Sequence, residues 1–102
     1  EQSQKSVICR LEEIEAERKR QKCNELRDRL LQAYRYYTNQ DANPRCAWSE
    51  MEASAFWDMF GDYEKNGGDG HMHTVVQPAM RALEVIPMHE ADRVVELMQS
   101  RR

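Results

Sequence analysis

The feature that most constrains this chain is a stretch without glycine or proline, residues 5–37. Strong helix formers fill it, and opposite charges recur four residues apart, as in Glu15 with Lys19 and Glu25 with Arg29. The stretch predicts one continuous helix of about 33 residues, about 50 Å long at about 1.5 Å per residue.

The apolar residues of this helix recur at alternating steps of three and four, as in a coiled coil. A charged segment, residues 17–22, separates them into two groups. The helix is longer than the width of a body formed by residues 39–102, so its N-terminal part must project beyond that body. The apolar residues before residue 17 therefore need another chain to cover them. The predicted self-association interface consists of Val7, Leu11, Ile14, Leu26 and Leu30. The alternative is a solitary charged helix that frays at its start.

The length of 102 residues favours one domain, and 32% charged residues with only four Gly favour helices with solvated faces. Residues 1–38 carry nine Lys/Arg and seven Asp/Glu, a net charge of +2. Residues 39–102 carry six and eleven, a net charge of -5. An acidic second half disfavours nucleic acid. The opposite signs favour head-to-tail contact between copies, which salt would screen.

The cysteines, Cys9, Cys23 and Cys46, are odd in number and lack paired spacing, so they do not indicate a disulfide framework. Reduced thiols are typical of a cytosolic protein. No apolar run reaches the roughly 20 residues that span a bilayer, and the first ten residues lack the apolar centre of a secretion signal. We therefore expect a cytoplasmic protein, with no membrane, no metal and no cofactor.

The second part of the chain predicts a compact three-helix body. Residues 38–45 are a loop by composition. Ser49 with Glu52 and Thr74 with Gln77 match capping boxes, which begin helices at about residues 50 and 75. A last helix, about residues 88–99, follows Pro87. The fold class is therefore all-α, with a long helix over 1–38 and a body over 39–102. The predicted core comprises Trp48, Phe56, Met59, Phe60, Val76, Met80, Leu83, Val94 and Val95.

The segment "EKNGGDGHMHT", residues 64–74, concentrates glycines around an aspartate and two histidines. It does not fit a calcium loop counted from Asp62, because Asp69 takes the apolar eighth place and His73 the bidentate twelfth. It lacks the Lys-Ser/Thr pair of a phosphate loop. His71 and His73, even with Cys46, lack the spacing of a zinc site.

A helix-to-helix turn explains these glycines better. Gly67 supplies the left-handed residue past a helix end, and Gly68 and Gly70 let the chain reverse. Asp69 can bond its own backbone in such a turn. The histidines then lie beside a hairpin turn at 67–70.

The segment "AYRYYTNQ", residues 33–40, places tyrosines beside an arginine at the base of the long helix. Aromatic rings beside arginine can stack on nucleobases, although they more often anchor a helix on its body. A basic pocket for a small nucleotide would need arginines. The candidate ligand-binding residues are Tyr34, Arg35, Tyr37, Arg45, His71, His73 and Arg81. No nucleophile is flanked by a base in a recognisable motif, so we do not expect an enzyme.

Residues 56–87, "FWDMFGDYEKNGGDGHMHTVVQPAMRALEVIP", resemble the C-terminal part of small proteins encoded by bacteriophages and prophages. In those proteins, a tyrosine precedes a Gly-Gly-[Asn/Asp]-Gly turn, and a short helix leads to an apolar-Pro ending. The matching residues here are Tyr63, Gly67, Gly68, Asp69, Gly70, Val85, Ile86 and Pro87. This sequence departs from that pattern by continuing past Pro87 with a further helix.

The resemblance implies a phage-type accessory protein. Some such proteins line up in assemblies, some block host factors, and some sequester nucleotide signals of antiviral defence. The functional expectation is a non-enzymatic homo-oligomer, built by the long helix, that binds a host or phage protein, with counter-defence as one such role. The alternative is an oligomeric sponge for a small anionic nucleotide. A second alternative is a nucleic-acid-binding regulator.

Overall fold

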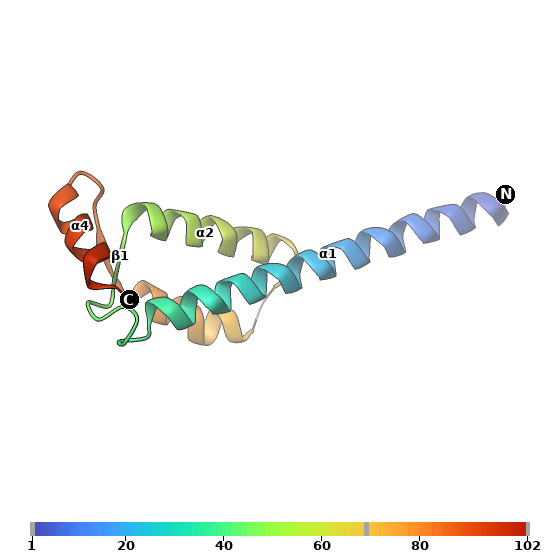
Figure 1. Cartoon of the computed structure of the whole chain (residues 1–102). Coiled ribbons are helices and arrows are strands. Elements are labelled where there is room, and N and C mark those ends of the chain that lie inside the picture. Colours follow the sequence, from blue (N-terminus) through green and yellow to red (C-terminus); the bar gives the residue numbers. More distant parts are fainter. Residues whose placement is uncertain (1, 69, 102) are drawn as a thin grey trace.

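The computed structural model describes residues 2–68 and 70–101, and the side chains of its first helix from Val7 onward. Helix α1 (Gln2–Tyr37) is one continuous helix of 36 residues, which confirms the long helix predicted from the glycine-free stretch. Its C-terminal half lies against the body, and its N-terminal half projects away from it (Figure 1). The molecule accordingly measures 66 × 26 × 20 Å.

The body is built on the C-terminal half of α1. Helix α2 (Glu50–Lys65) runs antiparallel to α1 (Figure 1). The short π-helix η1 (Met72–Val76) and α3 (Gln77–Arg81) pack against both α1 and α2. Helix α4 (Ala91–Ser100) closes the end opposite the N-terminus. The mostly helical architecture is confirmed.

A small parallel sheet joins β1 (Ala47–Ser49) to β2 (Glu84–Ile86), a pair that the all-α prediction missed. Trp48 pairs with Val85, and Ser49 with Ile86. Three-residue strands carry almost no periodicity, and their pairing partners lie 37 positions apart in the sequence. The sheet aligns β1 so that Trp48 is fully buried beneath α2.

The main core forms where α1, α2, η1 and α3 meet. It contains Leu26, Leu30, Trp48, Ala53, Phe56, Phe60, Tyr63, Met72, Val76, Met80 and Leu83. A smaller cluster beneath α4 contains Ala47, Ile86 and Leu97, with Val94 packed against it.

Most predicted core residues are confirmed, but the predicted core and the predicted self-association interface each need a correction. Val95 is 53% exposed, because α4 directs Leu97 inward instead. Met59 is only half-buried. Leu26 and Leu30, predicted to contact another copy, are 4% and 0% exposed in the core of their own chain. The predicted self-association interface therefore retains Val7, Leu11 and Ile14 alone.

The start of α2 follows the predicted capping box. The Ser49 hydroxyl accepts from the Glu52 backbone N–H at 3.2 Å, and the Glu52 carboxylate accepts from the Ser49 N–H at 3.0 Å. Ser49 therefore both ends β1 and begins α2.

The glycine turn ends α2 as predicted. Gly67 has a φ of +91°, and its N–H donates to the Glu64 carbonyl, while the Gly68 N–H donates to the Tyr63 carbonyl at 2.9 Å. This is the Schellman arrangement of a helix C-terminus. Asp69, to which a backbone bond was assigned, lies outside the described residues.

The second predicted capping box is wrong. Thr74 does not begin a helix but lies within η1, and its hydroxyl donates to the Gly70 carbonyl at 2.8 Å. A threonine hydroxyl can satisfy a preceding carbonyl as readily as it caps a helix. The last helix begins at Ala91, not near residue 88, because β2 and the turn after it occupy the preceding residues.

Candidate functional site

The most distinctive surface is an apolar stripe on the projecting half of α1, formed by Val7, Ile8, Leu11 and Ile14. These side chains are 56%, 55%, 54% and 48% exposed. They lie beyond the end of the body, so no other described element of the chain approaches them (Figure 1). Isolated exposed apolar residues are ordinary, but four on one helix segment form a candidate contact surface.

A second apolar surface is a groove between α1 and α2, with a volume of about 320 Å³. Ala33 and Tyr37 line it from α1, and Met51, Ala55, Phe56 and Met59 from α2, together with Glu52. Met51, Ala55 and Met59 are four residues apart, so they form one row along α2.

The Met51 side chain of the groove is 65% exposed. It also lines a neighbouring hollow of about 580 Å³ with Ser54, Asp58 and Met88. Methionine side chains are flexible and polarizable, so such surfaces adapt to varied partners. The α1–α2 face is therefore suited to holding another helix.

A polar cluster closes one end of this groove, where Tyr37, Glu52 and Arg101 meet. The Tyr37 hydroxyl donates to Glu52 Oε2 at 2.7 Å, and Arg101 Nη1 donates to the same oxygen at 2.6 Å. Arg101 Nη2 also donates to the Ala47 carbonyl at 3.0 Å. The Arg101 guanidinium lies 5.2 Å from the centre of the Tyr37 ring. These bonds tie the residue after α4 to β1, α2 and α1.

The electrostatics of the cluster favour a structural role. Burial raises the pKa of Glu52, but hydrogen bonds from Arg101, the Ser49 backbone and Tyr37 outweigh it and lower that pKa to about 2. Burial, followed by the bond to Glu52, raises the pKa of Tyr37 well above its ordinary value. A carboxylate this stable when ionised is a poor proton acceptor near neutral pH.

The predicted ligand residues lie in separate places. His73 and Arg81 share one flank of α2, where His73 contacts Glu64 at 3.5 Å and Arg81 lies 5.0 Å from the centre of the Trp57 ring. Tyr37 belongs to the polar cluster already described.

The remaining candidate ligand residues lie in other parts of the molecule. Arg45 pairs with Glu96 of α4 at 3.4 Å. Tyr34 is half-buried against the core, whereas Arg35 and His71 are exposed. Of the predicted ligand residues, Tyr37 lines the α1–α2 groove, and none of the others lines that groove or the neighbouring hollow.

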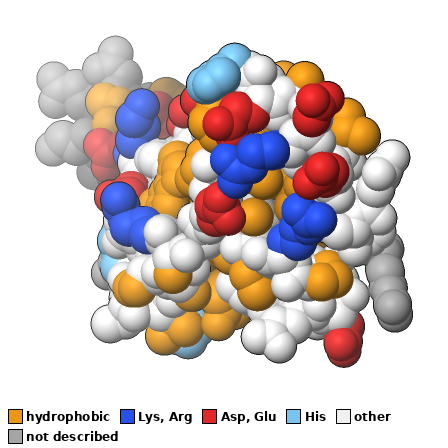
Figure 2. Space-filling model, turned by 90° about the vertical axis from the view of Figure 1, so that its left-hand side faces the viewer, with side chains coloured by type: hydrophobic (Ala, Val, Ile, Leu, Met, Phe, Trp, Pro, Cys, Tyr) orange, Lys and Arg blue, Asp and Glu red, His pale blue; other side chains and the backbone are white. Residues whose placement is uncertain are grey.

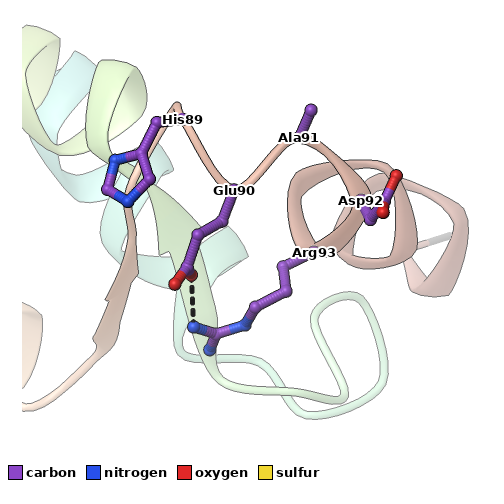
Figure 3. Close-up of a pocket in the computed structure, with 5 residues that line it drawn as sticks. All are labelled: His89, Glu90, Ala91, Asp92 and Arg93. Atoms are coloured by element: carbon purple, nitrogen blue, oxygen red, sulfur yellow. Dashed lines mark hydrogen bonds and ion pairs between the residues drawn. The ribbon is translucent and has the colours of Figure 1, made fainter.

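A further hollow, of about 380 Å³, lies where β2 leads into α4 (Figure 3). His89, Glu90, Ala91, Asp92 and Arg93 line it, and the Arg93 guanidinium reaches back to Glu90. Arg93 also pairs with Glu84 of β2. The hydrogen bonds that Arg93 donates to the Glu90 and Glu84 carboxylates raise its pKa. The cation is thus already neutralised by its own chain.

Metal-ligating side chains do not gather into groups of three or more anywhere in residues 2–68 and 70–101. Over the same residues, no helix is both long enough and apolar enough to cross a membrane. The end of the body around α4 carries acidic and basic side chains next to one another among apolar patches (Figure 2). That face offers mixed charge where a nucleic-acid strand would need a basic track.

Comparison of the chain with protein-family models, curated proteins and solved structures finds no match.

Sequence patterns did not predict several of the residues that define these surfaces. Met51 belongs to neither the predicted core nor the predicted interface, because helical periodicity does not show which side of an apolar face a neighbour covers. Ile8 lies one residue off the three-four pattern. Arg101 lies at the far end of the chain from the residues it joins, and no local pattern signals that contact.

Proposed function

We propose that this protein is a non-enzymatic, phage-type accessory protein that self-associates through the projecting half of α1 and acts by binding a host or phage protein. One observation carries the proposal. Val7, Ile8, Leu11 and Ile14 are about half exposed on a helix segment that extends beyond its own body.

Burying these side chains would stabilise an assembly. Burial of a fully exposed aliphatic side chain contributes about 1.5–3 kcal/mol, and the half-exposed residues of the stripe would each gain about half of that. Two copies contribute two stripes, and a helix that is already formed loses less conformational freedom on association than a segment that must fold. A preformed apolar helix is also a common protein-recognition element.

The chemistry of the described residues supports a binding role. The carboxyl with the largest pKa change, Glu52, is fully engaged by Ser49, Tyr37 and Arg101. It holds the body together and leaves no free base in the groove. The phage resemblance of residues 56–87 supports the type of partner, a host or phage protein.

Self-association is tested by sedimentation velocity over a wide range of concentrations. We expect the wild-type protein to sediment as an oligomer, and Leu11→Asp to sediment as a monomer with an unchanged helical circular dichroism spectrum. The matched control is Cys9→Asp, because Cys9 is exposed and lies on the opposite side of α1 from Leu11. A wild-type protein that remains monomeric at every concentration would refute the proposal.

Partner binding is tested by affinity capture from infected host cells. Wild-type protein and the Cys9→Asp variant should retain the same partner, and Leu11→Asp should retain less of it if the assembly forms the binding surface. Retention of no partner by any variant would contradict the interaction role while leaving self-association intact.

A further inference from the structure

We propose that two copies form a two-fold antiparallel dimer, in which the α1 stripe of each copy occupies the α1–α2 groove of the other. The inference rests on the proposed self-association and identifies the surface that receives the stripe. In this dimer the stripe of each copy covers the groove of the other, and two-fold symmetry limits the assembly to two copies.

The stripe and the groove have matching lengths. Val7, Leu11 and Ile14 span seven residues, or about 10 Å of helix, and Met51, Ala55 and Met59 span eight, or about 12 Å. Both are rows with helical spacing of three or four, which is how the side chains of packed helices interdigitate.

The direction of the second copy follows from the projection of α1. A parallel pair would place the two bodies side by side at the same end and would leave both grooves open. Only an antiparallel pair brings the projecting half of one α1 alongside the body of the other (Figure 1). The incoming segment then runs antiparallel to the receiving α1 and parallel to the receiving α2.

The charges agree with this direction. With Val7 of one copy beside Tyr37 of the other, Leu11 lies beside Ala33. One turn further on, Glu15 lies level with Arg29, and Lys19 lies level with Glu25. All four charged residues are exposed. Two-fold symmetry repeats both pairs, so opposite charges face each other at four places.

Charge on α2 agrees as well. With Val7 beside Met51 and Leu11 beside Ala55, the same spacing places Arg18 beside Asp62. The sequence of α2 contains five acidic residues and one basic residue, whereas the segment 18–22 contains four basic residues and no acidic one. The receiving helix and the arriving segment thus carry opposite charge, which favours this pairing and makes it sensitive to salt.

Charge exchange tests the register. One variant carries Glu15→Lys with Lys19→Glu, a second carries Glu25→Arg with Arg29→Glu, and a third carries all four changes. Each variant preserves the net charge and the opposite-charge pairing within its own helix. Each double variant, however, sets like charges against each other between copies.

We expect the dimer dissociation constant to rise about 10- to 100-fold in each double variant and to return to within about threefold of wild type in the quadruple variant. Sedimentation equilibrium at low salt measures it. A quadruple variant as weak as the double variants would overturn the antiparallel register. A parallel pair, in which residue 15 faces residue 15, would show no such rescue.

Disulfide trapping tests the groove itself. Proteins carrying Leu11→Cys and Ala55→Cys, each with Cys9→Ser, are mixed and oxidised. We expect a disulfide between the two different proteins. In the control, Glu64→Cys replaces Ala55→Cys, since position 64 is exposed and faces the opposite side of α2. The control should form no such bond.

The outcomes separate the two proposals. A disulfide between two copies of the Leu11→Cys protein, without the mixed product, would overturn the groove as the receiving surface while supporting self-association. Equal trapping of the Ala55→Cys and Glu64→Cys proteins would also overturn it. A monomer under all conditions would overturn both proposals.

Discussion

The polar cluster of Tyr37, Glu52 and Arg101 predicts a specific dependence of stability on pH. A carboxyl whose pKa falls from an ordinary value of 4.5 to about 2 contributes about 3 kcal/mol to folding when it is ionised, at about 1.36 kcal/mol per pH unit. The Glu52 side chain remains 22% exposed, so solvent screens part of this energy. We therefore expect about 2 kcal/mol.

The sign follows from the lowered pKa. The folded protein holds Glu52 ionised more strongly than the unfolded chain does, so the contribution is fully present above about pH 5. It is lost progressively as the pH falls from about 5 to about 2, because over that range the unfolded chain binds a proton that the folded protein does not. Below that range the carboxyl is protonated in both the folded and the unfolded chain, so it no longer contributes to the free energy of unfolding.

Glu52→Gln isolates this term. Glutamine at the third position of a helix can still complete a capping box, so the start of α2 is retained while the charge that faces Arg101 is removed. Urea unfolding, followed by the fluorescence of the buried Trp48, measures the free energy of unfolding at pH 7 and pH 3. At pH 7 the variant should be less stable by about 2 kcal/mol, and at pH 3 this difference should fall by about half or more.

The control for this experiment is Glu50→Gln, which changes an exposed carboxyl in the same first turn. Its effect should be small at both pH values. The reasoning would be refuted by a destabilisation of Glu52→Gln that is the same at pH 7 and pH 3, because the energy would then come from shape and not from charge.

Two further predictions concern packing and the glycine turn. Leu30→Ala should lower the free energy of unfolding by about 2–5 kcal/mol, because Leu30 is fully buried, whereas Leu11→Ala at a concentration where the protein is monomeric should change it by less than about 0.5 kcal/mol. Equal effects in thermal or urea unfolding would mean that α1 does not divide into a packed half and a projecting half. Gly68→Ala should cost about 1–3 kcal/mol, because a Cβ there would lie 2.3 Å from the ring of the buried Tyr63. Tyr63→Leu in the same background should recover part of that loss, and a neutral Gly68→Ala would contradict the contact.

The sequence predicts the parts of this fold whose causes are local. The long helix follows from its composition, and the start and end of α2 follow from Ser49, Glu52 and Gly67, each of which satisfies a helix terminus within a few residues. Periodicity also identified most of the core.

The parts that were missed depend on distant contacts. The strand pair forms only when α2 and α3 bring residues 47–49 and 84–86 together. The burial of Leu26 and Leu30 depends on where the body contacts α1. A heptad-like pattern does not show whether the helix packs against another chain or against its own domain. Asn43, fully buried, bonds to the Tyr37 and Ala47 carbonyls, and nothing in a Pro-containing loop signals that role.

The parallel direction of β1 and β2 also determines how this chain can acquire its structure. Parallel neighbours cannot be joined by a tight turn, so their pairing must wait until the whole intervening crossover is in place. The α1–α2 hairpin starts from the connection of residues 38–49, so its first contacts, such as Tyr37 with Glu52, close a short loop and can form early, even on a chain still being synthesised. After the hairpin forms and before β1 pairs with β2, α2 is packed on α1, but the cluster of Ala47 and Ile86 that α4 covers is not yet assembled. We therefore expect the end of the body that Arg101 joins to α2 and β1 to become ordered last.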